Sequence, residues 1–220
     1  MNINPVFRFP TTEHWVTALL FLCVLLFAWV KTAYPKRVTL VFREVFTASF
    51  SDEDTGINLA SIAMFIIFIC CSALLVMQVV NVEGMASAIS TGKEFLLIAA
   101  FFLFIYISKT LIILFSGLIF DEQQRAWEYL SEIYVFAHFL GLVLLPAALL
   151  VTYSSGKYVG TSLEIVFGAV AVLYVYRTIK MFILMTNKGL SMIYLFLYIC
   201  ALEILPYALL FKYAEMSLKI

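Results

Sequence analysis

The chain has 220 residues, of which 64% are apolar and 16% aromatic, and its mean hydropathy is +1.04. Soluble globular domains hold about 45 to 50% apolar residues, so this composition excludes a soluble single domain. The formal net charge is zero and no dense run of Lys and Arg occurs, which excludes nucleic acid as a partner.

Six long apolar runs contain only five of the 28 charged residues. A bilayer core about 30 Å thick needs about 20 helical residues, and the runs are of that order. We therefore predict an all-α polytopic membrane protein with six transmembrane helices in a single membrane domain over residues 1–220. The spans are expected at about 15–34, 58–82, 95–120, 133–153, 163–184 and 190–211.

The first run continues past Lys31 and is stopped by Pro35. No small-x-small cleavage site follows it, so we expect an uncleaved anchor rather than a signal peptide. Apolar residues at helical spacing then predict an interfacial amphipathic helix over about 36–50, lying flat on the membrane. These residues are Val38, Val41, Phe42, Val45 and Phe46. Further along, the acidic stretch from Asp121 to Glu128 is expected to extend the fourth span beyond the bilayer as helix.

The orientation is predicted from the distribution of Lys and Arg. Nine of the fourteen positive charges fall in, or point towards, the first, third and fifth connections. They are Lys31, Lys36, Arg37, Arg43, Lys109, Arg125, Arg177, Lys180 and Lys188. The positive-inside rule then places these connections in the cytoplasm and both termini in the periplasm of a bacterial inner membrane.

Several chemistries lack the residues they need. The chain has two histidines and no aspartate inside a span, which excludes HExxH metalloproteases and intramembrane aspartyl proteases. The cysteines lie in apolar runs without a CxxC motif and are interpreted as small hydrophobic residues. They are Cys23, Cys70, Cys71 and Cys200. We expect no metal, no cofactor and no enzymatic activity.

Three charged residues lie deep within the predicted spans. At 1.5 Å per residue from the span midpoints, Lys109 lies about 2 Å and Arg177 about 5 Å from the bilayer centre on the cytoplasmic side, and Glu203 lies about 4 Å from it on the opposite side. A charge at that depth costs at least about 2.5 to 3.5 kcal/mol, so each needs a partner. Lys109 matches the depth of Glu203 best, and Arg177 is the second candidate partner.

This charged group has two interpretations. It is either a structural ion pair that fixes helix packing, or a polar site or proton path inside the bundle. Pro206 frees the carbonyl of Leu202 near Glu203 and is a contributor in either case. The other candidate contributors are Tyr134, His138 and Tyr174. For His138, a neutral imidazole hydrogen-bonded between packed helices is the structural alternative to a proton shuttle or a headgroup site.

One segment of the chain resembles a known family. Residues 190–206 (LSMIYLFLYICALEILP), followed by Leu-Phe-Lys at 210–212, are similar to the closing signature of Bacteroidota integral membrane proteins grouped as domain of unknown function 4271. Residues 109–120 and 134–146 are similar as well, and Leu-Glu-Ile-Leu-Pro is the most specific element. The resemblance covers most of the chain from about Trp15 onward. It implies an inner-membrane protein of a Gram-negative envelope, with Lys109, Glu203 and Pro206 at matching places, and it implies no activity.

These observations favour an accessory or scaffold subunit of an inner-membrane cell-envelope complex that binds other integral membrane proteins. The connections are too short to form a catalytic domain, and 21 Phe with 12 Tyr exceed what a small bundle can bury, so many aromatics face lipid or partners. One alternative is a small transporter or proton-coupled carrier that uses Glu203. A second alternative is a lipid-modifying membrane enzyme.

Overall fold

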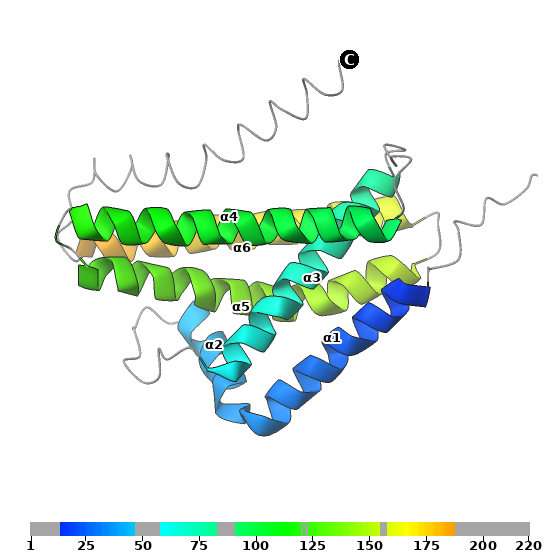
Figure 1. Cartoon of the computed structure of the whole chain (residues 1–220), viewed down its shortest axis with the longest axis horizontal. Coiled ribbons are helices and arrows are strands. Elements are labelled where there is room, and N and C mark those ends of the chain that lie inside the picture. Colours follow the sequence, from blue (N-terminus) through cyan, green and yellow to red (C-terminus); the bar gives the residue numbers. More distant parts are fainter. Residues whose placement is uncertain are drawn as a thin grey trace, which may run out of the picture. The chain divides into compact units, whose positions relative to one another are not determined.

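The computed structural model describes residues 14–46, 58–82, 91–119, 121, 123–154 and 158–187. This part of the chain is all helical (Figure 1). The helices are α1 (His14–Ala33), α2 (Pro35–Phe46), α3 (Leu59–Val82), α4 (Thr91–Ile119), α5 (Gln123–Tyr153) and α6 (Val159–Asn187). All except α2 are long and apolar enough to cross a membrane. The predicted all-α class is therefore confirmed for this part of the chain, and its five long apolar helices fit a multi-pass membrane protein.

Each of the first five predicted spans coincides with one of these long helices. α5 begins at Gln123, ten residues before the span predicted from Ile133, so the acidic stretch does extend this helix. The same helix continues through Pro146. The sixth predicted span, 190–211, lies outside the described residues, as do Cys200, Glu203 and Pro206.

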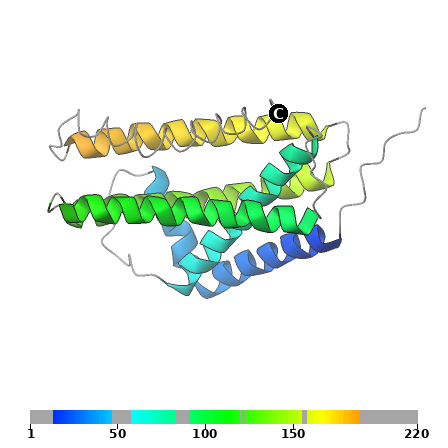
Figure 2. The ribbon, with the colours of Figure 1, turned by 45° about the horizontal axis from the view of Figure 1, so that its top comes forward.

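Contacts divide the chain into two units, residues 1–172 and 173–220, and α6 crosses the boundary between them. In the first unit, α3 is the central helix and contacts α1, α4 and α5. Figures 1 and 2 show α3 crossing α4 and α5 obliquely, from the corner where α1 meets α2 towards the far end of α5. About three fifths of the apolar window of α3 and of α5 is buried, against 6% for α4. The core of this unit therefore lies between α3 and α5.

A glycine permits the close approach of α3 and α5. A Cβ atom built on Gly141 would lie 3.1 Å from both the Cβ and the backbone nitrogen of Phe68, and 3.2 Å from the carbonyl oxygen of Met64. Because two of these neighbours are backbone atoms, they cannot move aside as a flexible side chain would. Small residues allow the backbones of membrane helices to approach closely, and Gly141 does this for α3 and α5. Both helices are apolar around this contact.

A helix lies where the interfacial helix was predicted: α2 covers Pro35–Phe46, and residues 47–50 of the predicted range lie outside the described residues. Its apolar face packs on α5: Val41 and Val45 are buried, while Phe42 and Phe46 meet the ring of Phe139 edge-on at 5.4 and 5.8 Å. The apolar side of α2 is therefore used against the bundle. Its location at the membrane surface stays a prediction.

Candidate functional site

A partly buried polar cluster forms where α2, α3 and α5 meet. Arg37 begins the inner face of α2, since Arg37, Val41 and Val45 follow one another at intervals of four residues. This register points the half-buried Arg37 side chain into the bundle along with the two buried valines. A terminal guanidinium nitrogen of Arg37 donates a hydrogen bond to Oγ of Ser61 on α3, at 2.9 Å.

The third member of the cluster is His138 of α5, which is only 7% exposed. Its imidazole is in hydrogen-bonding contact with the backbone of Ser61 and lies close enough to Arg37 for their charges to interact. The structure thus places His138 between packed helices, beside polar groups of α2 and α3. Arg37 was not singled out as a site residue from the sequence. Its register with Val41 and Val45 is the signal that would have identified it.

Other polar side chains also connect one helix to another. The side-chain nitrogen of Gln78 on α3 donates to the hydroxyl of Thr152 on α5 at 2.9 Å, and the hydroxyls of Thr110 on α4 and Tyr134 on α5 lie 3.1 Å apart. Tyr134 also meets the ring of Phe65 on α3 at 5.8 Å. Tyr134, a predicted contributor to a polar site, is therefore placed at the junction of α3, α4 and α5.

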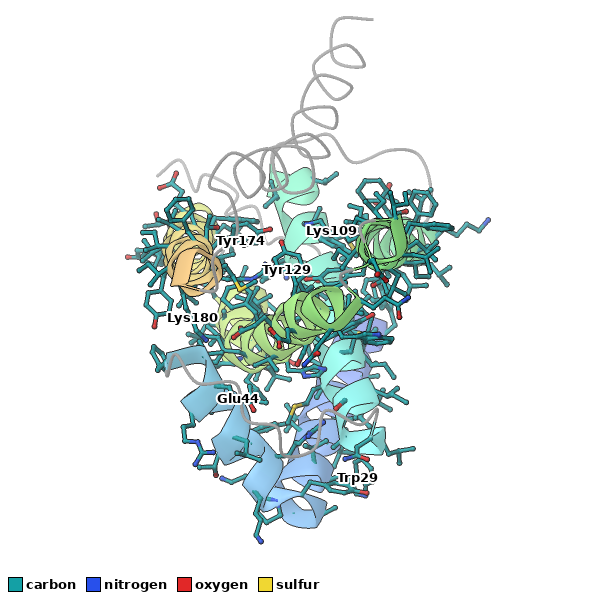
Figure 3. The ribbon with its side chains drawn as sticks, turned by 90° about the vertical axis from the view of Figure 1, so that its left-hand side faces the viewer. Trp29, Glu44, Lys109, Tyr129, Tyr174 and Lys180 are labelled. Atoms are coloured by element: carbon teal, nitrogen blue, oxygen red, sulfur yellow. The ribbon has the colours of Figure 1, made fainter. Side chains whose placement is uncertain are left out.

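Lys109 lies on the inner side of α4. It shares this side with Tyr106 and with the buried Ile113, at helical intervals of three and four residues. Tyr106 contacts the rings of Phe65 and Phe68 on α3, both at 5.3 Å, so this side of α4 faces the bundle. Lys109 itself is half-buried, and Figure 3 shows it on the side of α4 towards α5. Its pairing with Glu203 stays a prediction.

Arg177 and Tyr174 lie together in the second unit. The Arg177 side chain is 6% exposed, and its guanidinium carbon lies 5.6 Å from the centre of the Tyr174 ring, one turn earlier on α6. A cation at that distance over an aromatic face is stabilised by the ring quadrupole. α6 therefore supplies a neighbour for this deep cation from within its own sequence.

Three of the four cysteines come together between α1 and α3. The Cys23 thiol on α1 is in hydrogen-bonding contact with the thiols of Cys70 and Cys71 on α3, and all three are free. Cys23 and Cys71 are fully buried, in keeping with their interpretation as small apolar residues. Within the described ranges, no group of three or more His, Cys, Asp or Glu side chains is placed to hold a metal ion.

The outer side of α4 carries a regular apolar stripe, which we name the α4 stripe. Its members are all exposed, and they recur at intervals of three or four residues along almost the whole helix. They are Leu97, Ala100, Phe104, Ile107, Leu111, Phe115 and Leu118. α4 is thus a two-sided helix, with Tyr106, Lys109 and Ile113 on the inner side.

The long apolar helices, the polar contacts between them and the glycine-mediated packing define a helical multi-pass membrane protein. The chain belongs to the family described as domain of unknown function (DUF4271), whose model matches residues 16–214. No match to the chain is found among the curated proteins or among the solved structures.

Proposed function

We propose that this protein is an accessory or scaffold subunit of an inner-membrane envelope complex, and that it binds other integral membrane proteins through the α4 stripe. The observation that carries the proposal is the contrast within α4: one side is fixed to α3 and α5 by aromatic and hydroxyl contacts, while the other presents large apolar side chains over the length of a membrane span.

The spacing of the α4 stripe supports a helical partner. Intervals of three and four residues align side chains in a seam that a neighbouring helix can meet with its own ridge. Phe104 and Phe115 supply large rigid contact surfaces, exposed by 67% and 61%, while Ala100 permits a close approach of backbones. The inner contacts hold the stripe in place before binding, which reduces the entropy cost of association.

The test shortens three side chains of the α4 stripe and compares this variant with a control variant that has three changes elsewhere on the same helix. Phe104, Leu111 and Phe115 are changed together to Ala, and the control changes Leu103, Ile112 and Ile119, which are also exposed apolar residues of α4 outside the stripe. Each tagged full-length chain is purified in mild detergent, companions are identified by mass spectrometry, and the size of the assembly is measured on native gels.

We expect the unaltered chain and the control to retain the same integral membrane companion in a fixed ratio, and the stripe variant to lose it while keeping its own folded yield. Equal retention by the stripe variant would overturn the role of the stripe. An unaltered chain that migrates alone in mild detergent, with no companion in a fixed ratio, would overturn the scaffold function.

A second candidate function, a small transporter or proton-coupled carrier, is favoured by the position of Lys109. An ion or proton path through a membrane protein needs polar groups on the inner sides of its helices. Lys109 is a half-buried cation in such a position. This alternative predicts that variants of Lys109 keep their folded yield and lose function, a result that a purely structural lysine does not give.

The orientation proposed for the chain places both termini in the periplasm. A cysteine introduced at Ser51 in the first connection is then expected to resist an impermeant thiol reagent in intact cells, and one at Ser155 is expected to react. The opposite labelling pattern would invert the topology and leave the helix count unchanged.

A further inference from the structure

The exposed surface where α1 ends and α2 begins combines aromatic and basic side chains. We define the cationic corner as Trp29, Lys31, Tyr34, Lys36 and Arg43, all of which are exposed. Figure 1 shows α1 running down to the turn between the two helices and α2 turning away from it, and Figure 3 labels Trp29. The corner shares no residue with the α4 stripe, so variants of the corner leave the stripe unchanged.

Backbone hydrogen bonds fix the turn that forms the corner. The amide of Tyr34 donates to the carbonyl of Val30 at 2.8 Å, and the amide of Arg37 donates to the carbonyl of Tyr34 at 3.0 Å. Pro35 occupies the first position of α2, where its missing N–H costs nothing and its fixed φ favours the helix. The side chains of the corner therefore project from a defined backbone.

α2 separates its basic residues onto two faces. Lys36, Thr39 and Arg43 lie on one exposed face at intervals of three and four residues, whereas Arg37 lies on the buried face and bonds to Ser61. The Arg37–Ser61 hydrogen bond and the buried Val41 and Val45 hold α2 against the bundle. Lys36 and Arg43 thereby lie on a different face of α2 from the buried valines.

The corner lies at the end of a membrane-spanning helix. Trp29 and Tyr34 meet edge-on, with ring centroids 5.9 Å apart, directly after the apolar body of α1. Trp and Tyr concentrate at the level of lipid headgroups, where one end of the ring is apolar and the other is hydrated. The corner thus combines an aromatic pair near the end of α1 with three exposed cations on α1 and α2.

We propose that the cationic corner binds the phosphate of an anionic glycerophospholipid, with phosphatidylglycerol as the simplest example. Lys31, Lys36 and Arg43 contact the phosphate oxygens, and Trp29 and Tyr34 pack on the glycerol and upper acyl carbons. Between residues 29 and 46 only Glu44 is acidic, so charge complementarity selects an anionic lipid over a zwitterionic one. Each basic residue near an anionic surface contributes about fivefold in association, which is about 1 kcal/mol.

The experiment uses the tryptophan of the corner as its own reporter. Trp15 and Trp127 are changed to Phe in the full-length chain, which leaves Trp29 as the single tryptophan. The protein is placed in phosphatidylcholine nanodiscs in which equal fractions of lipid are replaced by brominated phosphatidylglycerol or brominated phosphatidylcholine, and quenching of Trp29 fluorescence is compared. Circular dichroism and size-exclusion chromatography confirm that each variant is folded.

We expect stronger quenching by the brominated phosphatidylglycerol, with the preference reduced about fivefold by Arg43→Gln alone and abolished by Gln at Lys31, Lys36 and Arg43 together. A control with the same loss of charge, Gln at Lys93, Lys157 and Lys212, retains the preference. Equal quenching by the two lipids in the unaltered corner would overturn the proposal, as would an equal loss in the control. Loss of the preference on adding inorganic phosphate at constant ionic strength would show a site for free phosphate and would also overturn it.

Discussion

α3 and α5 differ from α4 in burial and hardly at all in hydropathy. All three are apolar enough to span a membrane, yet about 61% of the α3 and α5 windows is buried against 6% for α4. In a bilayer the lipid tails are as apolar as leucine, so hydropathy brings a helix into the membrane without bringing it into the core. Gly141 lets α5 approach α3 closely, and a hydrogen bond from Gln78 to Thr152 links the same two helices. α4 has a hydroxyl contact to α5 as well, so the close approach at the glycine is the feature that sets the α3–α5 pair apart.

The largest effect is expected on the inner side of α4, at Lys109. If Lys109 pairs with Glu203, Glu203→Gln alone strands a buried cation and lowers the stability by about 3 to 5 kcal/mol, whereas Glu203→Gln with Lys109→Met leaves no charge to satisfy. Folded yield in detergent should recover in the double variant. Recovery of function as well indicates a structural pair, and continued loss of function indicates a proton or substrate site. Equal losses in the two single variants that add in the double variant would show that the residues do not interact.

Gly141 tests the interface between α3 and α5. Gly141→Ala introduces a Cβ at 3.1 Å from backbone and side-chain atoms of Phe68, and overpacking of this kind costs about 1 to 3 kcal/mol. The matched control is Gly168→Ala in α6, where a Cβ would meet nothing within 4 Å and helix propensity improves by up to about 1 kcal/mol. Denaturant titration of both variants in detergent measures the difference. A Gly141→Ala protein as stable as the control would contradict the close packing of α3 on α5.

Substitutions on the inner and outer faces of α2 are expected to differ by a smaller amount in stability. Arg37→Met removes the hydrogen bond to Ser61 and is expected to lower the stability by about 1 kcal/mol, because it also leaves the polar groups around His138 without that neighbour. Arg43→Met, on the exposed face of the same helix, should change the stability by less than about 0.5 kcal/mol. Thermal unfolding followed by size-exclusion chromatography compares the two. Similar losses would show that Arg37 is not part of the core.

The smallest effect concerns the link between Gln78 and Thr152. A double-mutant cycle with Gln78→Leu and Thr152→Val should give a coupling of about 0.6 kcal/mol, the average for hydrogen bonds between membrane helices. The cycle is measured by the same denaturant titration. A coupling energy of zero would show that this hydrogen bond does not help to bury α5. Gly141 would then be the main cause of that burial.

The sequence was sufficient for the existence and approximate position of the first five long helices. Apolar runs of about 20 residues have one stable form in a bilayer, and Pro35 set the end of the first helix and the start of α2. It also predicted a helix after the first long helix, where α2 lies. The sequence could not show that the apolar face of α2 packs on Phe139 of α5. An apolar helix face can be buried equally well against other helices or against lipid, so the pattern alone does not distinguish the two.

The candidate site was predictable in part. His138 stood out as one of only two histidines, whereas Arg37 was counted as one of many cytoplasmic charges. Its inward direction follows from its register with Val41 and Val45, but its partner Ser61 lies 24 residues away and is known only from the packing of α2 on α3. The contact of Cys23 with Cys70 and Cys71 was hidden for the same reason, since helix rotation is not encoded in an evenly apolar span.

A photo-cross-linking scan of α4 decides whether its outer side binds another membrane protein. A photoreactive phenylalanine analogue is introduced at each position of α4 from Leu96 to Ile119 in cells, and the products are identified by mass spectrometry. We expect cross-links to one companion membrane protein that peak at Leu97, Phe104, Leu111 and Leu118 and are absent at Tyr106 and Ile113. Products at the stripe positions that contain only lipid, or only this chain itself, would contradict the proposal.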